Sequence, residues 1–471
     1  MYKQSESKQL HFQGLGPRKV VADFDGGTLT SDAGGLLLRE LDLGLGIIDG
    51  FAGCFIDYRD PDAIEHPLRQ LVAQRVFGIC LGYEDLNDFE QLRYDPLIAA
   101  LCGRVDVQGR EREREEDKGK ALAGKSTLSR LECGGADVGP ESRYKKISYD
   151  EQKCQRLLVD HFLHCYKGGK APRQIVLDLD ATDDPLHGNQ EGRFYHGFFR
   201  CYCYLPLYVF CGDYLLGAKL RPSDIDAPAG ADVELARIVA QIREAWPKVK
   251  ITVRGDSGFC REWLMKWCED NGVDYLFGMA RNTRLREAIE AEMQQARELH
   301  RSTGKAARVY KGFQYRTRDS WSCSRRLVGK AEYLDGGENP RFVVTSLESN
   351  RWPAARLYEK LYCPRGEMEN RIKEQQLYLF ADRTSSTTMR ANQLRLWFSS
   401  VGYLLMNELR QRGLAGTELA RAQCNTIRLK LLKIGARVSL SVRRVVIHMA
   451  SGYPYQSLLR ATLARIQEAY P

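Results

Sequence analysis

The sequence predicts an α/β fold that is built around a mixed sheet. Short apolar segments have the length and composition of buried strands, and aspartates stand at the ends of two of them, 174–180 and 249–255. Helical patterns alternate with these segments, which is typical of a sheet that is covered by helices. The expected strands are 174–180, two or three within 194–220, 249–255 and 273–279, and the expected helices are 231–245, 262–271, 367–378 and 392–409.

Two changes of pattern divide the chain further. Residues 283–350 interrupt the alternation with a polar helix and several basic, strand-like segments. Residues 66–78 have helical spacing, Gly82 breaks it, and a second helical stretch follows; this suits a DNA-binding module, and it suits a plain helical bundle equally well. We therefore expect a flexible tail (1–20), a mostly helical N-terminal DNA-binding region (21–150), a core in two parts (172–282 and 351–410), a β-rich insertion domain (283–350) and a basic C-terminal region (411–471).

The composition is that of a globular protein. Hydrophobic residues make up 43% and charged residues 28% of the chain. No segment approaches the roughly 20 apolar residues that cross a bilayer, and Met1–Lys8 lack the apolar stretch of a signal peptide. These features predict a cytoplasmic protein without a membrane partner, whose cysteines are reduced.

The net charge of +9 is concentrated near the C-terminus. Residues 410–471 contain eleven Lys or Arg and two acids, so the whole formal excess lies there. A focused basic segment indicates a polyanionic partner, and a solvated face is the alternative. Apolar and polar residues alternate over 427–431 and 438–442, which predicts a hairpin with its basic side chains outward. The side chains expected on that surface are Arg428, Lys430, Arg437 and Arg443, and Arg444 adjoins them.

Residues 119–127 match the pattern of a phosphate-binding loop, G-x-x-x-x-G-K-[ST]. Such a loop needs a buried strand directly before it, and the residues before Gly119 are charged. We therefore expect no nucleotide here, but a helix that begins at Ser126 or Thr127. Lys125 would lie at the start of that helix, where it could contact a DNA phosphate.

Carboxylates follow the apolar strands and return near a later helix. Asp178 and Asp180 share one face of the first strand, and Asp180 is nearer its end. Asp256 ends the second strand, and Glu369 stands among arginines at a helix start. Each acid alone is more often a turn former or a surface ion pair. Together they could hold two Mg²⁺ ions, which catalyse phosphodiester chemistry.

These residues resemble a known family. The motifs Leu177–Gly188, Arg254–Phe259 and Tyr362–Glu374 are similar to those of DDE transposases of bacterial insertion sequences, in the group with the Tyr-Arg-Glu-Lys signature and insertion-sequence family thirteen-eighty. Tyr362, Arg365 and Glu369 fit that signature. Its lysine position falls on Gln376, and Lys373 is the nearest substitute, one helical turn earlier.

The resemblance implies an RNase H-like core that carries Asp180, Asp256 and Glu369 as catalytic and metal-binding residues for two Mg²⁺ ions, with Mn²⁺ able to substitute. It implies cleavage at the terminal inverted repeats of an insertion sequence, joining to target DNA, and a homodimer on DNA. Trp321 is a candidate, by position only, for contact with a flipped base. The alternative is a catalytically inactive or domesticated DNA-binding protein of the same fold. The DNA-binding residues we expect are Tyr362, Arg365, Arg371, Lys373, Lys125, Arg437, Arg443 and Arg444.

Overall fold

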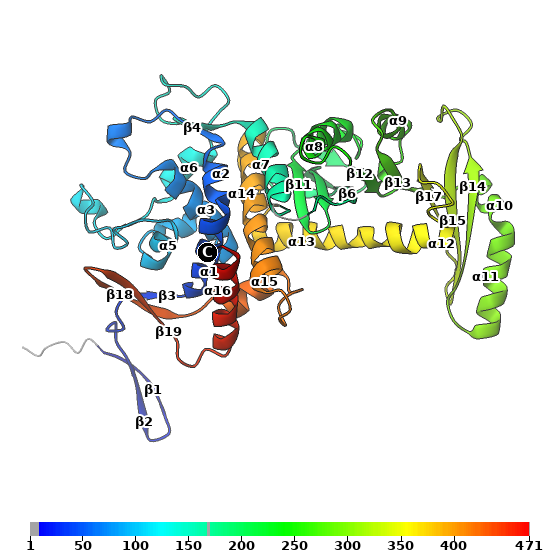
Figure 1. The fold of residues 1–471 in the computed structure, drawn as a ribbon. Coiled ribbons are helices and arrows are strands. Elements are labelled where there is room, and N and C mark those ends of the chain that lie inside the picture. Colours follow the sequence, from blue (N-terminus) through cyan, green and yellow to red (C-terminus); the bar gives the residue numbers. More distant parts are fainter. Residues whose placement is uncertain (1–8, 167–169, 471) are drawn as a thin grey trace, which may run out of the picture. The chain divides into compact units, whose positions relative to one another are not determined.

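The computed structural model describes residues 9–166 and 170–470 (Figure 1). The chain divides into two compact units. One consists of Met1–Ile48, Pro61–Ser129 and Glu408–Pro471, and the other of Asp49–Asp60 and Arg130–Asn407. The second unit contains the sheet with the acidic motifs, so its architecture comes first.

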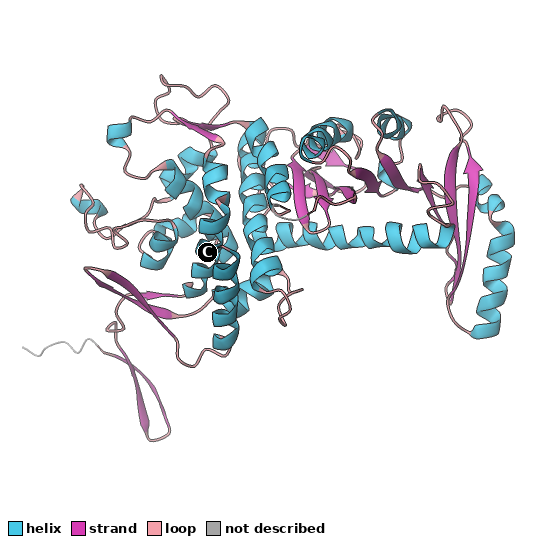
Figure 2. Cartoon of the chain, viewed as in Figure 1, coloured by secondary structure: helices cyan, strands magenta, loops and turns pink. Residues whose placement is uncertain are grey.

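A single mixed sheet organises the second unit (Figure 2). Its strands run in the order β11-β10-β6-β12-β13-β17-β15-β14. β6 is antiparallel to β10 and parallel to β12, and β12 is parallel to β13. The bounds are β6 Gln174–Ala181, β10 Leu207–Cys211, β11 Tyr214–Lys219, β12 Lys250–Gly255 and β13 Asp274–Met279. The strands predicted at 174–180, 249–255 and 273–279 are thus present close to their expected ends.

Helices cover both faces of this sheet (Figure 1). On one face, apolar side chains of α7 (Glu151–His164), α8 (Ala231–Ala245) and α9 (Glu262–Asp270) pack on alternate residues of the strands. On the other face, Leu357 and Leu361 pack on Leu276 and Val343. These leucines belong to a nearly continuous helix that consists of α12 Ala354–Arg356, the π-helix η6 Leu357–Tyr362, the 3₁₀ turn η7 Cys363–Arg365 and α13 Gly366–Leu379.

The segment expected as an insertion domain continues the core sheet. It forms α10 Thr283–Ala288, α11 Glu290–Thr303, β14 Ala307–Tyr315, β15 Arg325–Leu334, β16 Gly337–Glu338 and β17 Arg341–Thr345. β17 pairs with both β13 and β15, so the inserted strands extend the sheet at its edge. The buried Arg325 fastens β15 to α9, with ion pairs of 2.5 Å to Glu262 and 2.7 Å to Glu269.

A small three-stranded sheet interrupts the chain between β6 and β10. Its strands are β7 Asp184–Pro185, β8 Phe194–His196 and β9 Cys201–Tyr204, in the order β7-β9-β8. A pair formed by β4 Phe55–Asp57 and β5 Ile147–Tyr149, together with α14 Met389–Glu408, completes the unit. Tyr149 of this pair contacts Trp397 of α14 edge to face, with 5.4 Å between the ring centroids.

The first unit is mostly helical. Pro67 precedes α3 as its N-cap residue, and Gly82 ends that helix with a positive φ of 95°, a conformation that glycine adopts without strain. The helices are α1 Leu36–Leu45, α2 Ile47–Ala52, α3 Leu68–Leu81, α4 Phe89–Leu92, α5 Pro96–Leu101, α6 Lys125–Glu132, α15 Cys424–Ile427 and α16 Gln456–Ala469, of which α2 and α6 run into the other unit. Its strands are β1 Leu10–Leu15, β2 Arg18–Ala22, β3 Leu29–Thr30, β18 Ala436–Ser441 and β19 Arg444–Met449.

Two expectations for this unit need correction. Residues 1–8 of the expected tail lie outside the described residues, whereas β1 and β2 pair as an exposed hairpin. The C-terminal hairpin predicted from 427–431 and 438–442 is not formed, because residues 427–431 are helical. The hairpin that is present pairs β18 with β19, so most of the predicted second strand lies in its first strand. The buried residues of the 427–431 segment recur at helical spacing, and Arg428 is buried there, donating to the Cys80 carbonyl at 2.8 Å near the end of α3.

None of the helices within the described residues is long and apolar enough to cross a membrane.

Candidate active site

Asp180 is the penultimate residue of β6, and its surroundings disfavour its charge. Burial, as the largest cause, and the negative charges of Asp256 and Glu369 together raise the pKa of Asp180 to about 7, against the lowering effect of Arg365. The Asp180 carboxylate accepts a hydrogen bond of 3.0 Å from the backbone of Ala181. The two other carboxylates predicted from the sequence are therefore close enough to Asp180 to act on it electrostatically.

Asp256 follows β12 at the same edge of the sheet. Asp178 of β6 pairs with Arg254 of β12 in parallel register, so residues 180 and 256 lie level with each other. The Asp256 carboxylate accepts a hydrogen bond of 2.8 Å from the backbone of Gly258 and so caps the short helix Ser257–Phe259. This hydrogen bond fixes the orientation of the carboxylate at the carboxyl end of the strand.

Glu369 lies in the first turn of α13, on the helix that crosses the sheet. Its carboxylate forms an ion pair with Arg365, one turn earlier, at 2.9 Å. Burial lowers the pKa of Arg365, but the surrounding Tyr362, Asp180, Glu369 and Asp256 raise it overall. Arg365 thus stands among the three carboxylates as their counter-charge.

Asp178, which shares its face of β6 with Asp180, has a separate role. Its two carboxylate oxygens accept hydrogen bonds from Arg254 at 2.5 and 2.7 Å, and both side chains are buried. Arg254 also donates to the carbonyl of Leu361 in η6. Asp178 is therefore occupied by a pairing that connects β6, β12 and the helix that carries Glu369.

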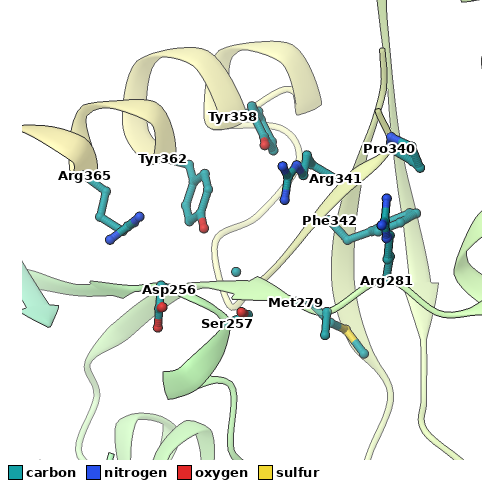
Figure 3. A pocket seen from close by; sticks show the side chains of 12 residues that line it. Asp256, Ser257, Met279, Arg281, Pro340, Arg341, Phe342, Tyr358, Tyr362 and Arg365 are labelled. Carbon is teal, nitrogen blue, oxygen red and sulfur yellow. The ribbon is translucent and has the colours of Figure 1, made fainter. Parts of the chain in front are cut away.

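An open cavity of about 590 Å³ adjoins Asp256 (Figure 3). Tyr358, Tyr362 and Arg365 line it from the helix, Arg341 lies beside Tyr358, and Arg281 lines it near Met279. Three arginines around one carboxylate give the cavity a positive lining. Such a cavity suits an anionic ligand beside the acidic cluster.

Gly278 of β13 allows the helix to approach the sheet closely. A Cβ at this position would lie 2.5 Å from the Tyr362 hydroxyl and 2.9 Å from the backbone nitrogen of Ser257. Any other residue would therefore displace Tyr362 or the backbone beside Asp256. The sequence reasoning did not single out Gly278, because a glycine inside a strand does not by itself reveal what packs against it.

The donor set suits divalent metal ions. Carboxylate oxygens are the ligands that Mg²⁺ prefers, and the pKa of Asp180 is raised first by burial and then by the charges of Asp256 and Glu369, which a bound cation would offset. The ligand oxygens of the three acids do not all lie within 4.8 Å of one another. In a site for two ions about 3.5–4 Å apart, acids that hold different ions need not approach so closely.

The remaining candidates on α13 differ in their surroundings. Arg371 is two residues, or about 200°, from Glu369 around the helix, and it pairs with Asp213 at 2.7 Å and Glu374 at 3.0 Å. Lys373 lies one turn after Glu369 on the same side and is exposed. Gln376, at the signature lysine position, donates to the carbonyl of Asp183 at 2.9 Å. Of these side chains, Lys373 is the exposed cation beside the acidic cluster.

Trp321 does not suit the role suggested by its position. Its side chain is only 5% exposed and packs edge to face on Tyr315, with 5.9 Å between the ring centroids. The Arg325 guanidinium lies 5.6 Å from the Trp321 ring. The indole belongs to the core, so the suggestion that it contacts a flipped base is wrong for this conformation.

Four candidate cations belong to the other unit. Arg437, Arg443 and Arg444 lie on or beside the β18–β19 hairpin and are exposed. Lys125 is the first residue of α6, and its amino group hydrogen-bonds Asn87 at 3.2 Å. A turn that contains the short helix Glu115–Asp117, and no strand, precedes α6 among the described residues 109–124. This is not the strand-loop-helix arrangement of a phosphate-binding loop.

Comparisons with known proteins place the chain in a family. Among solved structures, it is similar to the piggyBac transposase in a cryo-EM structure of that protein's synaptic complex with hairpin DNA, with 13% identity, a TM-score of 0.40, and coverage of 93% of this chain and 82% of that one. A search of curated proteins gave no match. A family model described as "Transposase DDE domain group 1" matches residues 12–471. The chain therefore belongs to the DDE-domain transposases of this group.

Proposed function

We propose that this protein cuts DNA at the terminal inverted repeats of an insertion sequence and joins the ends to target DNA. The observation that carries the proposal is the electrostatic coupling of Asp180, Asp256 and Glu369, which come from two strands and a helix. Family membership supports the same reaction class. The spacing of these acids in the sequence and their electrostatic coupling in the structure are separate observations, and both point to the same three residues.

The strand order supports an RNase H-like core. The antiparallel strands β11, β10 and β6 are followed by the parallel strands β12 and β13, with Asp180 on the central strand and Asp256 after its parallel neighbour. The strands β14 to β17 extend the sheet at its edge beside β13. In the sequence they lie between Asp256 and Glu369. In this proposal they are an insertion that enlarges the surface next to the acids.

Asp180, Asp256 and Glu369 would hold two Mg²⁺ ions, and Mn²⁺ could substitute. When bound, such ions supply the Lewis-acid chemistry that activates a water or a 3′-hydroxyl and stabilises the leaving oxygen. Arg365 would exchange its ion pair with Glu369 for a phosphate of the DNA, and Tyr362 would position that phosphate over the strand ends. The buried Asp178–Arg254 pair would keep the strands and the helix in register.

DNA binding would use further cations. Lys373 is placed to contact the backbone near the acids, and Arg371 would act mainly by holding α13 to Asp213. Lys125, Arg437, Arg443 and Arg444 would bind DNA outside the catalytic unit. Because two ends must be cut and joined together, we propose that a homodimer assembles on the DNA.

Cleavage of the element's own ends tests the proposal. The substrate is DNA that flanks the gene on both sides, incubated with the full-length protein and Mg²⁺ or Mn²⁺. Asp180→Asn, Asp256→Asn and Glu369→Gln should each abolish cleavage and leave DNA binding intact. Glu367→Gln is the matched control, because this exposed acid lies on the same helix, two residues from Glu369. Cleavage by Glu369→Gln would contradict the assignment, as would a loss of cleavage in Glu367→Gln alone. A wild-type protein that binds the DNA but never cuts it would favour a catalytically inactive DNA-binding protein of the same fold.

A further inference from the structure

The small sheet β7-β9-β8 leaves the core sheet at the edge that carries Asp180. Ala181 at the end of β6 pairs with Leu207 at the start of β10. The residues between them, 182–206, must therefore emerge where the carboxylates lie. The β8–β9 hairpin thus belongs to a loop whose two ends lie at the candidate active site, although none of the catalytic residues belongs to it.

The base of the hairpin is firmly attached to the core. Tyr204 is fully buried, and its hydroxyl donates to the Glu191 carbonyl at 2.6 Å. The Glu191 backbone nitrogen donates to the Thr387 carbonyl at 2.9 Å, and its carboxylate accepts from the Met389 backbone. Ser223 donates to the Phe194 carbonyl at 3.0 Å. The hairpin thus projects from a fixed support.

The hairpin carries several exposed flat side chains. Tyr195 and Tyr202 lie directly opposite each other, with 5.5 Å between their ring centroids. The Arg193 guanidinium lies 3.9 Å from the centroid of the Tyr202 ring. Tyr195 is 56% and Tyr202 44% exposed, and Phe198 at the tip is 83% exposed. We call Arg193, Tyr195, Phe198 and Tyr202 the aromatic platform.

The platform does not contribute to the core, so its exposure needs another explanation. Aromatic rings interleaved with arginine form stacking surfaces for unpaired bases, because every base has a π-face. The local charge agrees, since Arg193 and Arg200 are cationic and Glu191, the acid between β7 and β9, is turned to the Met389 backbone. Aromatic side chains and arginines are also enriched in protein interfaces, so a second copy of the chain is the alternative occupant that the experiment must separate.

We propose that the aromatic platform stacks on unpaired nucleotides of the DNA beside the cleavage site. This rests on the proposed function and names a part of its substrate: DNA whose bases are unpaired next to the scissile phosphate. Tyr195, Tyr202 and Phe198 receive the bases, and Arg193 and Arg200 supply positive charge for the backbone. The platform would hold the strand end away from its complement while the carboxylates act on it.

The experiment compares three fluorescently labelled DNAs of equal length: a blunt duplex, a forked duplex with several unpaired nucleotides, and a single-stranded oligothymidine. Binding is measured with the full-length protein and with Tyr195→Ala/Tyr202→Ala. Affinity of the double variant for the forked and single-stranded DNAs should fall roughly 5- to 100-fold, with blunt-duplex binding unchanged. Two controls should bind all three DNAs like the wild type: Tyr195→Phe/Tyr202→Phe, which keeps both rings, and Tyr144→Ala, which removes another exposed tyrosine near an arginine (Arg143, 4.9 Å).

Equal affinity of the double variant and the wild type for the fork would overturn the proposal, as would an equal loss for all three DNAs. So would a double variant that loses self-association, measured by light scattering, while DNA binding stays intact, because the occupant would then be a second copy. Cleavage separates this inference from the proposed function. If the wild type cuts the element's ends and the double variant still prefers the forked DNA, the inference about the platform is wrong and the proposed function stands. If the wild type never cuts but prefers the forked DNA, and the double variant loses that preference, the proposed function is wrong and the inference about the platform stands.

Discussion

Asp178 and Arg254 form a buried, bidentate ion pair across the parallel strands β6 and β12, two residues before the candidate metal ligands on each strand. Burial raises the pKa of Asp178 even though Arg254 opposes this effect. Because Arg254 also donates to the Leu361 carbonyl, the pair determines how the helix with Glu369 meets the strands with Asp180 and Asp256. The relative position of the three acids therefore depends on a pair that contacts none of the proposed metal ions.

The first prediction concerns the two members of this pair. Arg254→Met leaves the Asp178 carboxylate buried without its partner, so the free energy of unfolding should fall by about 3–5 kcal/mol. Asp178→Leu/Arg254→Met removes both charges and should recover a large part of that stability, while DNA cleavage stays impaired because Leu361 remains unattached. Chemical denaturation and end cleavage measure the two effects. A double variant as unstable as Arg254→Met would show that charge burial is not the cause.

The second prediction concerns the close approach at Gly278. Gly278→Ala places a methyl group against the Tyr362 hydroxyl and the Ser257 backbone, so cleavage should fall at least tenfold. Adding Tyr362→Phe removes one of these clashes and should restore part of the packing, measured as an increase in Tm. Gly336→Ala is the control, because nothing lies within 4 Å of a Cβ at that position. Normal cleavage by Gly278→Ala would mean that Tyr362 is not held in place by this contact.

The places of the three candidate acids in the fold could be predicted because local patterns determine them. Asp180 and Asp256 end apolar strands, and strand length and composition are visible in short windows. Glu369 was selected over Glu367 by its spacing from Tyr362 and Arg365, and in the structure it is the acid paired with Arg365. The order of strands and helices in the core could be predicted for the same reason.

Other features depend on contacts between distant parts of the chain. The pairing of Asp178 with Arg254 requires the register of two strands that no local pattern specifies. The burial of Trp321 and the continuation of the sheet through β17 are likewise tertiary. At 427–431, alternation favoured a strand, but the buried positions 424, 427, 428, 431 and 432 show that helical spacing over a longer window prevailed.

The third prediction follows from the raised pKa of Asp180. The folded-state pKa is about 7 and the unfolded value is near 3.8, so the folded state holds this proton more tightly. The contribution of Asp180 protonation to the stability of the folded state is therefore complete below pH 3.8, and it is lost as the pH rises through 7. Without metal, Asp180→Asn should therefore have a higher Tm than the wild type at pH 8, and a similar Tm at pH 4. Mn²⁺ should raise the Tm of the wild type at pH 8 and have little effect on the variant.

A control variant separates this effect from general surface charge. Asp319→Asn removes an exposed carboxylate in the same unit, and its Tm should follow that of the wild type at both pH values and with Mn²⁺. Thermal unfolding monitored by circular dichroism is sufficient. If Asp180→Asn is less stable than the wild type at pH 8 without metal, the prediction is wrong. In that case other groups of the protein stabilise the charged Asp180 carboxylate without a cation.

The last prediction concerns the exposed cations of the β18–β19 hairpin. Arg437→Ala/Arg443→Ala/Arg444→Ala should weaken binding to duplex DNA and flatten its salt dependence, because fewer counterions are released. For up to three lost phosphate contacts, the slope of log K against log salt should decrease by up to about 2.7. Arg301→Ala/Lys305→Ala/Arg318→Ala changes the net charge equally but removes exposed cations of the other unit. If both triple variants alter the slope equally, overall charge and not the hairpin determines binding, whereas a change confined to the hairpin variant locates DNA on β18 and β19.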